Sequence, residues 1–439
     1  MKRFFIIASM AILAIGCQKT EIQNEVQNQI GFSTETGKQT RAIVDGTTYD
    51  VNQPFGVYAY GYQLETVNDP TTGEPVTQRI ENTTSTPMEN IEFAYDNSWK
   101  ATNNVKYYWP NDPRSRLDFY AYSPAHVSDG TAANAHQKLT GDITHSEKEN
   151  ENDTDYGLIL SDYEHTNMYV DFMVATPVIG ATYLDQNGAV SGTPTSVPLD
   201  FKHEMTQINF VVKLNATETI VNGEVTSVED KYPNIDFTIN SIVLNNVVSG
   251  ATYAYNKADY ATTGLKWTPT EDAIASYKIY PATKRTDPEQ GDFVNSIGAP
   301  ALINVDAEDV DEVTEQTVVL RTDPTGTRDE QQLTVNAANP GYKFSTTPVT
   351  MIPQAWNNEN PQSFTITYTI SGEGVATEQI IKTFNFNAAS TVAPNWIANN
   401  RITYTLIIGL NEITFTPTVS PWSDASGVYY NPDNIAPEE

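Results

Sequence analysis

Apolar and polar residues alternate along most of this chain, and this period of two is the feature that most limits its possible folds. Successive side chains of a β-strand point to opposite faces, so alternation indicates strands with one buried face. No long stretch has the 3.6-residue spacing of an amphipathic helix. The sequence therefore predicts an all-β protein built of sandwiches. The clearest rows are Phe55, Val57, Ala59; Leu117, Phe119, Ala121; Ile208, Phe210, Val212, Leu214; Phe364, Ile366, Tyr368, Ile370; and Ile402, Tyr404, Leu406, Ile408, Leu410.

Segments 65–90, 126–157, 185–198 and 283–300 are rich in Asn, Asp, Thr, Gly and Pro and are expected to be loops. From Val197 to Met205 the apolar residues occupy odd positions, and from Ile208 onward they occupy even positions. Such a phase change predicts a bulge or a junction between two strands. A chain of 439 residues exceeds the usual size of one core. We place the boundary at about residue 195, which gives domains 42–195 and 196–439.

The N-terminus has the features of an export signal. Lys2 and Arg3 precede an apolar run over 4–15, which is too short to cross a hydrocarbon core of about 30 Å as a helix. The chain's one cysteine, Cys17, directly follows this run and the small residue Gly16, as in a bacterial lipobox. The sequence therefore predicts a signal peptide over 1–16 and lipidation of Cys17. An ordinary secreted protein with a buried cysteine is the alternative.

The formal charge of −30 argues against binding to nucleic acid or to an anionic membrane surface. An aromatic content of 10% is too high for a disordered chain and suits pleated sheets. Acidity and aromatic content together indicate an exposed, folded surface protein.

The motifs for catalysis are missing, so we expect no enzyme, no cofactor and no metal site. His203 begins "HEMTQ", half of a zinc-protease helix motif, but the second histidine is absent and the alternation puts His203 on a strand. Acidic segments 152–157 and 306–312 lack the ligand register of a calcium loop. Tyr58, Tyr60 and Tyr62 share a strand face; they could stack on sugars, although cross-strand packing is the more common role.

Several segments in order resemble the fimbrillin-like family of Bacteroidales, the subunits of surface pili and related lipoproteins. They are the lipobox cysteine, "IGFST" (30–34), "TRA" (40–42), "FGVYAY" (55–60), "VKYYWP" with "RLDFYAYSP" (105–124), "LDFKHEMTQINFVV" (199–212), "MIPQ" with "FTITYTI" (351–370), and "NRITYTLIIGLNEITFTPTVSPW" (400–422).

The resemblance implies two tandem sandwiches of the transthyretin-like type and export as a lipoprotein. It also implies removal of segment 17–41 by cleavage between Arg41 and Ala42, because these residues match the family's cleavage site. Loss of the first strand then opens a groove, and an extended segment of a neighbouring pilus subunit fills that groove. This places the mature protein in a fimbrium on the cell outer membrane.

The residues themselves suit this sequence of events. Ile30 and Phe32 alternate with small polar residues, so the removed strand has one apolar face. Burial of each large side chain stabilises by about 1.5–3 kcal/mol, and loss of the strand leaves an apolar groove with unpaired backbone. Arg41 is isolated in a polar stretch, with Lys38 as the competing protease site.

Two segments are candidate donors. One is the alternating stretch 413–420, with Ile413, Phe415 and Val419 as its apolar residues and Pro417 suited to an edge. The other is the tail after Trp422.

Two functions follow. The first is a structural and adhesive pilus subunit with other subunits as partners. The alternative is a monomeric surface lipoprotein that binds a host glycan or protein and stays anchored through Cys17.

Overall fold

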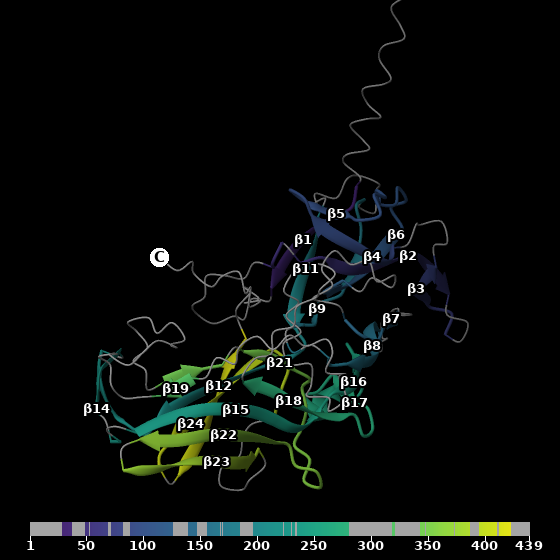
Figure 1. Ribbon diagram of the computed structural model, residues 1–439. Helices are drawn as coiled ribbons and strands as arrows, with labels where there is room; N and C mark the ends of the chain where they lie inside the picture. The colour runs from purple at the N-terminus through teal and green to yellow at the C-terminus, as the bar shows by residue number, and fades with distance from the viewer. Residues whose placement is uncertain are drawn as a thin grey trace, which may run out of the picture.

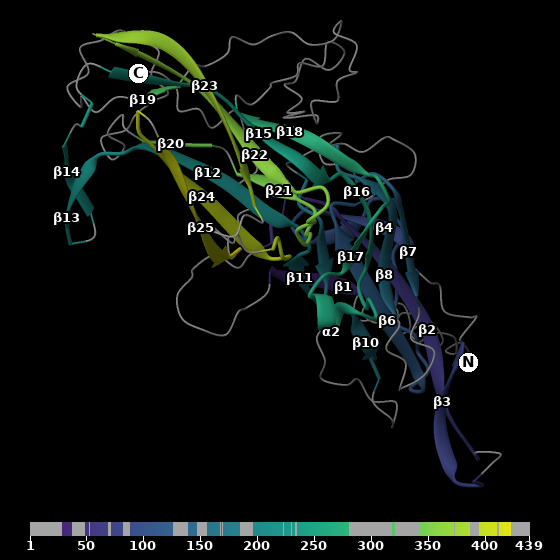
Figure 2. The same cartoon turned by 90° about the horizontal axis from the view of Figure 1, so that it is seen from below.

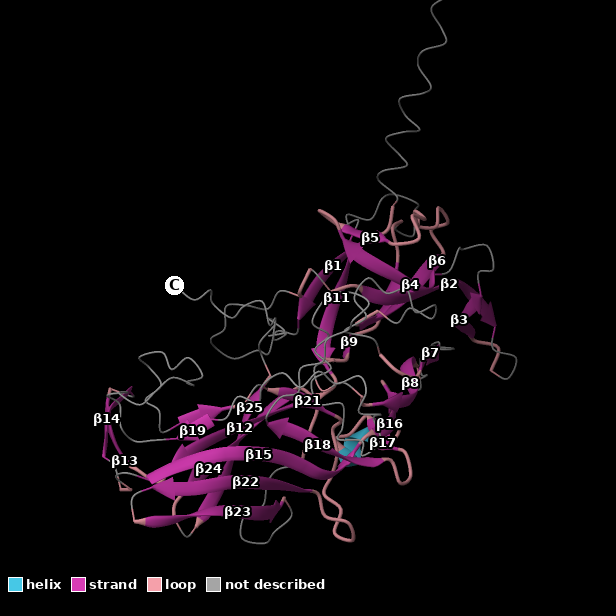
Figure 3. Cartoon of the chain, viewed as in Figure 1, coloured by secondary structure: helices cyan, strands magenta, loops and turns pink. Residues whose placement is uncertain are grey.

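The fold is described from a computed structural model, and it consists almost entirely of strands (Figure 3). This confirms the predicted all-β class. One short helix, α2 (Tyr260–Thr263), lies among the described residues. The structure describes residues 29–36, 49–51, 53–68, 72–81, 88–125, 139–146, 156–166, 168, 170–184, 196–222, 224–229, 231–232, 235–280, 318–320, 343–346, 348–372, 374–386, 395–410 and 412–422.

The first sheet has the strand order β1-β11-β9-β6-β2-β4-β5, with β10 beside β6 and β3 beside β2. The strands at its two edges, β1 and β5, contact each other, so the sheet curls and encloses its inner face (Figure 1). That face holds a core rich in aromatic side chains, among them Phe55, Phe93 and Phe119. The strands are β1 Gly31–Thr36, β2 Phe55–Asn68, β3 Pro75–Glu81, β4 Met88–Tyr95, β5 Trp99–Ala101, β6 Ser115–Ser123, β9 Met173–Ala175, β10 Val178–Ala181 and β11 Ser196–His203.

A four-stranded sheet packs on the outer face of the first one. Its order is β17-β16-β8-β7, so β16, from the later part of the chain, pairs with β8 from the earlier part, while β17 and β7 are the edge strands. The core between the two sheets contains Tyr120, Tyr122, Leu160 and Trp267. The strands are β7 Asp142–Ser146, β8 Gly157–Glu164, β16 Gly250–Ala254 and β17 Trp267–Pro269.

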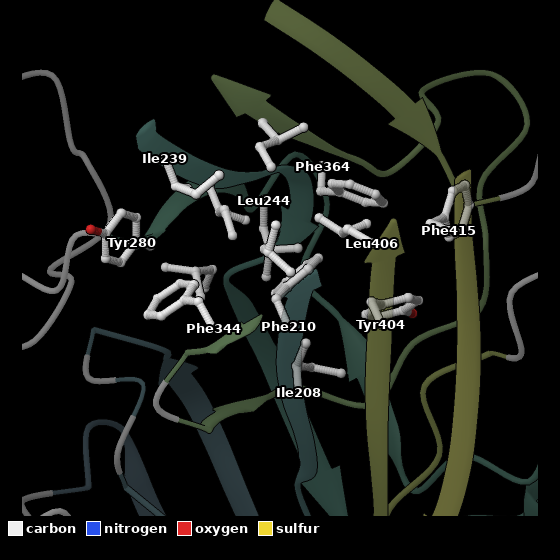
Figure 4. Packing of buried hydrophobic residues seen from close by; sticks show 14 of the residues in the cluster. Ile208, Phe210, Ile239, Leu244, Tyr280, Phe344, Phe364, Tyr404, Leu406 and Phe415 are labelled. Carbon is white, nitrogen blue, oxygen red and sulfur yellow. The ribbon is translucent and has the colours of Figure 1, made fainter. Parts of the chain in front are cut away.

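Two further sheets form the second sandwich. One has the order β20-β12-β24-β25 with β21 beside β12, and the other has β18-β15-β22-β23 with β19 beside β15. Phe210, Phe364 and Tyr404 interdigitate between them (Figure 4). The strands are β12 Thr206–Leu214, β15 Ile235–Val248, β18 Ile274–Tyr280, β19 Val318–Leu320, β20 Lys343–Ser345, β21 Val349–Met351, β22 Ser363–Gly372, β23 Val375–Asn385, β24 Asn400–Ile408 and β25 Ile413–Pro421.

A separate hairpin, β13 (Thr217–Val221) with β14 (Glu224–Glu229), projects from the far end of this sandwich (Figure 2). At the edges of the two sheets, β23 and β25 lie outermost in the described strand orders.

The alternating rows predicted as strands are all present, and the phase change near Met205 is a junction between two strands. β11 ends at His203 in the first sheet, and β12 begins at Thr206 in the second sandwich. The domain boundary near residue 195 stays a prediction. Among the described residues, no helix has the length and apolar character needed to cross a membrane.

The loop predictions at 65–90, 126–157 and 185–198 were wrong in part, since β11 already begins at Ser196, and the predicted loop 283–300 lies outside the described residues. β2 continues to Asn68 and pairs with β3, and β7 lies within 126–157. β3 is mostly polar, so it has no alternation of apolar and polar residues from which a strand could be predicted. It is fixed instead by Arg79, which pairs with buried Asp118 at 2.6 Å and donates to the Tyr62 hydroxyl at 2.9 Å.

Candidate functional site

The candidate site is the edge of the first sheet where β1 lies on β11. The two strands run parallel, in register from Gly31 opposite Ser196 to Thr36 opposite Phe201. The predicted strand at Ile30 to Thr34 is therefore present, and it is the outermost strand of this edge (Figure 1).

Two side chains fix β1 to the core. Ile30 and Phe32 are only 6% and 8% exposed. The ring of Phe32 meets three aromatic rings edge-on, those of Phe93 at 4.7 Å, Phe119 at 5.8 Å and Phe55 at 5.9 Å between centroids. Edge-to-face contacts of this kind add to the stability gained from burial. Phe32 is therefore the main anchor of the strand.

The other side of β1 is held by the segment after β5. The amide of Ile30 donates to the Tyr107 carbonyl at 2.9 Å, and Gln29 forms an isolated bridge with Tyr108. β1 thus closes the curl of the sheet between β11 and residues 107–108. Removal of β1 would open this closure on both sides.

The described residues on either side of the predicted cleavage site, Thr36 and Tyr49, both lie beside Phe201. Thr36 pairs with Phe201, and the ring of Tyr49, where the described chain resumes, lies 4.7 Å from the Phe201 ring. Arg41 and Ala42 lie between them, outside the described residues, as does the predicted lipidation site Cys17.

Tyr49 anchors the chain that follows this segment. Its hydroxyl donates to Ser123 Oγ at 2.6 Å, and Gln53 Nε2 donates to the same oxygen at 2.9 Å. Burial raises the pKa of the Tyr49 phenol far above its usual value, so the hydroxyl stays protonated and remains a donor. No local pattern in the sequence indicates this anchor, because Ser123 lies 74 residues from Tyr49 in the chain.

The candidate donor residues lie in β25, which pairs with β24 along its whole length. Phe415 is buried against Phe364 and Phe384, at 5.3 and 5.4 Å between ring centroids. Ile413 is partly buried, and Val419 is 45% exposed. The structure therefore places these three residues in the chain's own second sandwich, at its edge.

The end of β25 reaches the first sheet. The ring of Trp422 stacks on that of His203, the last residue of β11, at 4.1 Å and 7°. His203 Nδ1 lies 2.6 Å from Asp171 Oδ2, and both side chains are buried. Trp422 thus brings the candidate donor strand to the strand that carries β1.

No group of three or more metal-binding side chains occurs within the described ranges. The acidic segment 306–312 lies outside them, as does most of 152–157. His203 contributes instead to the pairing with Asp171 and to the stack with Trp422.

A family model described as fimbrillin-like matches residues 40–422, a stretch that begins after β1 and ends at Trp422. A comparison with curated proteins finds no match.

Two solved structures illustrate the likeness. A fimbrial protein from Bacteroides vulgatus is 16% identical, with a TM-score of 0.46, over 90% of this chain and 99% of that chain. The tip fimbrial protein Mfa3 from Porphyromonas gingivalis, with a C-terminal truncation, is 12% identical, with a TM-score of 0.28, over 85% of this chain and 96% of that chain.

Proposed function

The chain belongs to the fimbrillin-like family, and on this premise we propose that it is a structural and adhesive subunit of a pilus on the cell outer membrane. It is exported as a lipoprotein through Cys17, is cut between Arg41 and Ala42, and joins other pilus subunits by exchange of a strand. The observation that carries this proposal is the position of β1, a short edge strand that closes the first sheet.

Loss of β1 leaves a groove of defined chemistry. Val197, Leu199 and Phe201 of β11 are buried on the inner face of the sheet beside it. The pocket of Phe32, lined by Phe55, Phe93 and Phe119, would lose its occupant. An apolar groove beside unpaired backbone groups is a template for the addition of a strand from another chain.

The rest of the first sheet does not depend on β1 for its pairing. β6 pairs with β2 and with β9, and β11 keeps β9 as a partner. The new chain start after Arg41 is held by Tyr49 through Ser123 and Phe201. The cut therefore converts a closed precursor into an open subunit that is still folded.

β25 supplies a side-chain pattern that suits the groove. Ile413 and Phe415 have the same spacing as Ile30 and Phe32, and both pairs are followed by Thr or Ser. The aromatic residue of an incoming β25 would occupy the pocket of Phe32. The second candidate donor, residues 423–439, lies outside the described residues.

The test is cleavage with an arginine-specific protease, followed by size-exclusion chromatography and electron microscopy. We expect the uncut chain to be monomeric and the trimmed chain to assemble. Arg41→Ala should block both trimming and assembly. Arg114→Ala, which changes an exposed arginine elsewhere in the first domain, is the matched control and should behave as the parent. A trimmed chain that stays monomeric with an unchanged melting temperature would contradict the proposal and favour the anchored lipoprotein.

A further inference from the structure

A row of aromatic rings lies away from the β1 groove, along the rim where the first sheet meets the four-stranded sheet. We call Tyr60, His145, Tyr156, Tyr255 and Tyr260 the tyrosine row. Tyr60, Tyr156 and Tyr255 are partly buried and pack on the core between the two sheets. Tyr260 is 47% exposed. The row is therefore part of the surface, while its inner edge is fixed by the core.

One end of the row is a stacked pair. The rings of Tyr60 on β2 and His145 on β7 are 4.2 Å apart and inclined by 16°. Tyr58 stacks on the same imidazole at 4.9 Å and donates its hydroxyl to the Ile143 carbonyl at 2.9 Å. These contacts hold Tyr60 and His145 in a single orientation.

The buried ring of Tyr120 connects this end of the row to its middle. Tyr120 lies 6.0 Å from His145 and 6.5 Å from Tyr156 between centroids. Next along the row, the Tyr255 ring lies on Gly157, where a Cβ atom would come within 2.8 Å of it. Gly157 also has a φ of +125°, a conformation that favours glycine. The close approach fixes the position of Tyr255.

The other end surrounds a neutralised lysine. Lys266 Nζ is 4.7 Å from the Tyr255 ring and 5.8 Å from the Tyr260 ring. The same ammonium pairs with buried Glu204 at 2.6 Å. The ion pair offsets the positive charge of the ammonium beside these two rings.

We propose that the tyrosine row binds a neutral oligosaccharide. The C–H groups on one face of a sugar ring suit the negative face of an aromatic ring, and tyrosine adds a hydroxyl for hydrogen bonding. Rings that are already fixed lose little conformational entropy when a ligand binds.

Charge decides which glycans fit. The chain carries a formal charge of −30, so sialylated or sulfated sugars are repelled from its surface. The site would serve an anchored monomer as well as a pilus subunit, so it stands independently of the assembly mechanism.

The test is binding of the purified chain to immobilised neutral oligosaccharides, with sialylated forms of the same sugars as a second panel. We expect binding to members of the neutral panel. Tyr260→Ala and Tyr60→Ala should each weaken it by about tenfold, which corresponds to about 1.4 kcal/mol. Tyr95→Ala is the matched control, since Tyr95 is also 45% exposed but lies on β4 outside the row; it should bind as the parent does.

Absence of binding to every neutral glycan would overturn the proposal, as would binding to sialylated glycans alone. Equal binding by the Tyr260→Ala and Tyr60→Ala variants and the parent would overturn it as well. Circular dichroism spectra of each variant separate loss of binding from loss of fold. Trimming at Arg41 and assembly should be unchanged in all three variants, so failure of the glycan site and failure of the assembly mechanism give different results.

Discussion

The two edge strands β1 and β25 carry the same Ile-x-Phe pattern but are held in different ways. β1 pairs with β11 over six positions in parallel, and a separate bridge at Gln29 supports its start. β25 pairs with β24 over nine positions in antiparallel register, and only a short connection separates the two strands along the chain. β1 is therefore joined to its sheet by contacts distant in sequence, and β25 by contacts that are local.

This difference indicates what a cut does at each edge. A cut after Arg41 separates β1 from the rest of the chain, so only its side chains and backbone pairing retain it. β25 remains covalently next to its partner. Under the proposed mechanism, β1 would leave the subunit permanently, whereas β25 would remain available for exchange.

The largest expected effect comes from the matched substitutions Phe32→Ala and Phe415→Ala. Both rings are almost equally buried, at 8% and 7% exposure. Removal of a buried phenylalanine side chain costs about 3–5 kcal/mol, so each substitution should lower the free energy of unfolding of its domain in the uncut chain. After trimming at Arg41, Phe32→Ala should have no effect, while Phe415→Ala keeps its full effect. Thermal unfolding of the parent and of the two variants, each uncut and trimmed, measures this.

If Phe32→Ala destabilised the trimmed chain as much as the uncut one, β1 would still be bound after cleavage. The comparison between the two edges would then fail.

A smaller effect is expected from pH, and it concerns the contact between the two regions. His165 is fully buried, with Nε2 2.8 Å from the carbonyl of Thr350 in β21 and Nδ1 3.0 Å from the Tyr163 hydroxyl. Burial lowers the pKa of His165 to about 4. The neutral ring is thus favoured in the fold, so its contribution to stability is complete above the unfolded pKa of about 6.5 and is lost as the pH falls toward 4.

A pKa shift of this size corresponds to a decrease of about 3 kcal/mol in the free energy of unfolding between pH 6.5 and pH 4. The substitution His165→Gln should reduce the pH dependence of the free energy of unfolding in this range, which urea unfolding at several pH values measures. His145→Gln, at a partly exposed histidine whose pKa is also lowered by burial, is the control and should flatten it less. An unchanged slope in His165→Gln would show that another group governs the pH response.

Next in size is the contact between Trp422 and His203. Trp422→Leu keeps apolar bulk but removes the ring stack, which is expected to cost about 0.5–1.5 kcal/mol. Hydrogen exchange in β25 should rise while that in β22 stays constant. Equal exchange in the parent and the variant would show that the stack does not hold the end of β25.

The smallest effect is expected at the outer part of β25. Val419 is 45% exposed, so Val419→Thr should change the free energy of unfolding by less than about 0.5 kcal/mol. A larger loss would mean that another part of the protein covers this edge, and β25 would then be harder to exchange than the comparison assumes.

The sequence predicted both edge strands, because alternation at Ile30 and Phe32 and at Ile413 and Phe415 is a local signal. It could not predict what holds them. The bridge between Gln29 and Tyr108 joins residues far apart in the chain, and the stack of Trp422 on His203 does the same. Polar β3 was missed for a related reason, since it depends on the pairing of Arg79 with Asp118, which is distant in sequence. Contacts of this kind leave no periodic pattern in either segment.

The most direct test is hydrogen exchange, followed by mass spectrometry, on the monomeric fraction before and after cleavage at Arg41. We expect hydrogen exchange in β11 (Ser196–His203) to accelerate after the cut, while exchange in β24 (Asn400–Ile408) stays the same. Unchanged protection of β11 would show that β1 does not leave, and loss of protection in both strands would show that the fold does not survive its removal. Either result would contradict the central claim that β1 is a detachable strand.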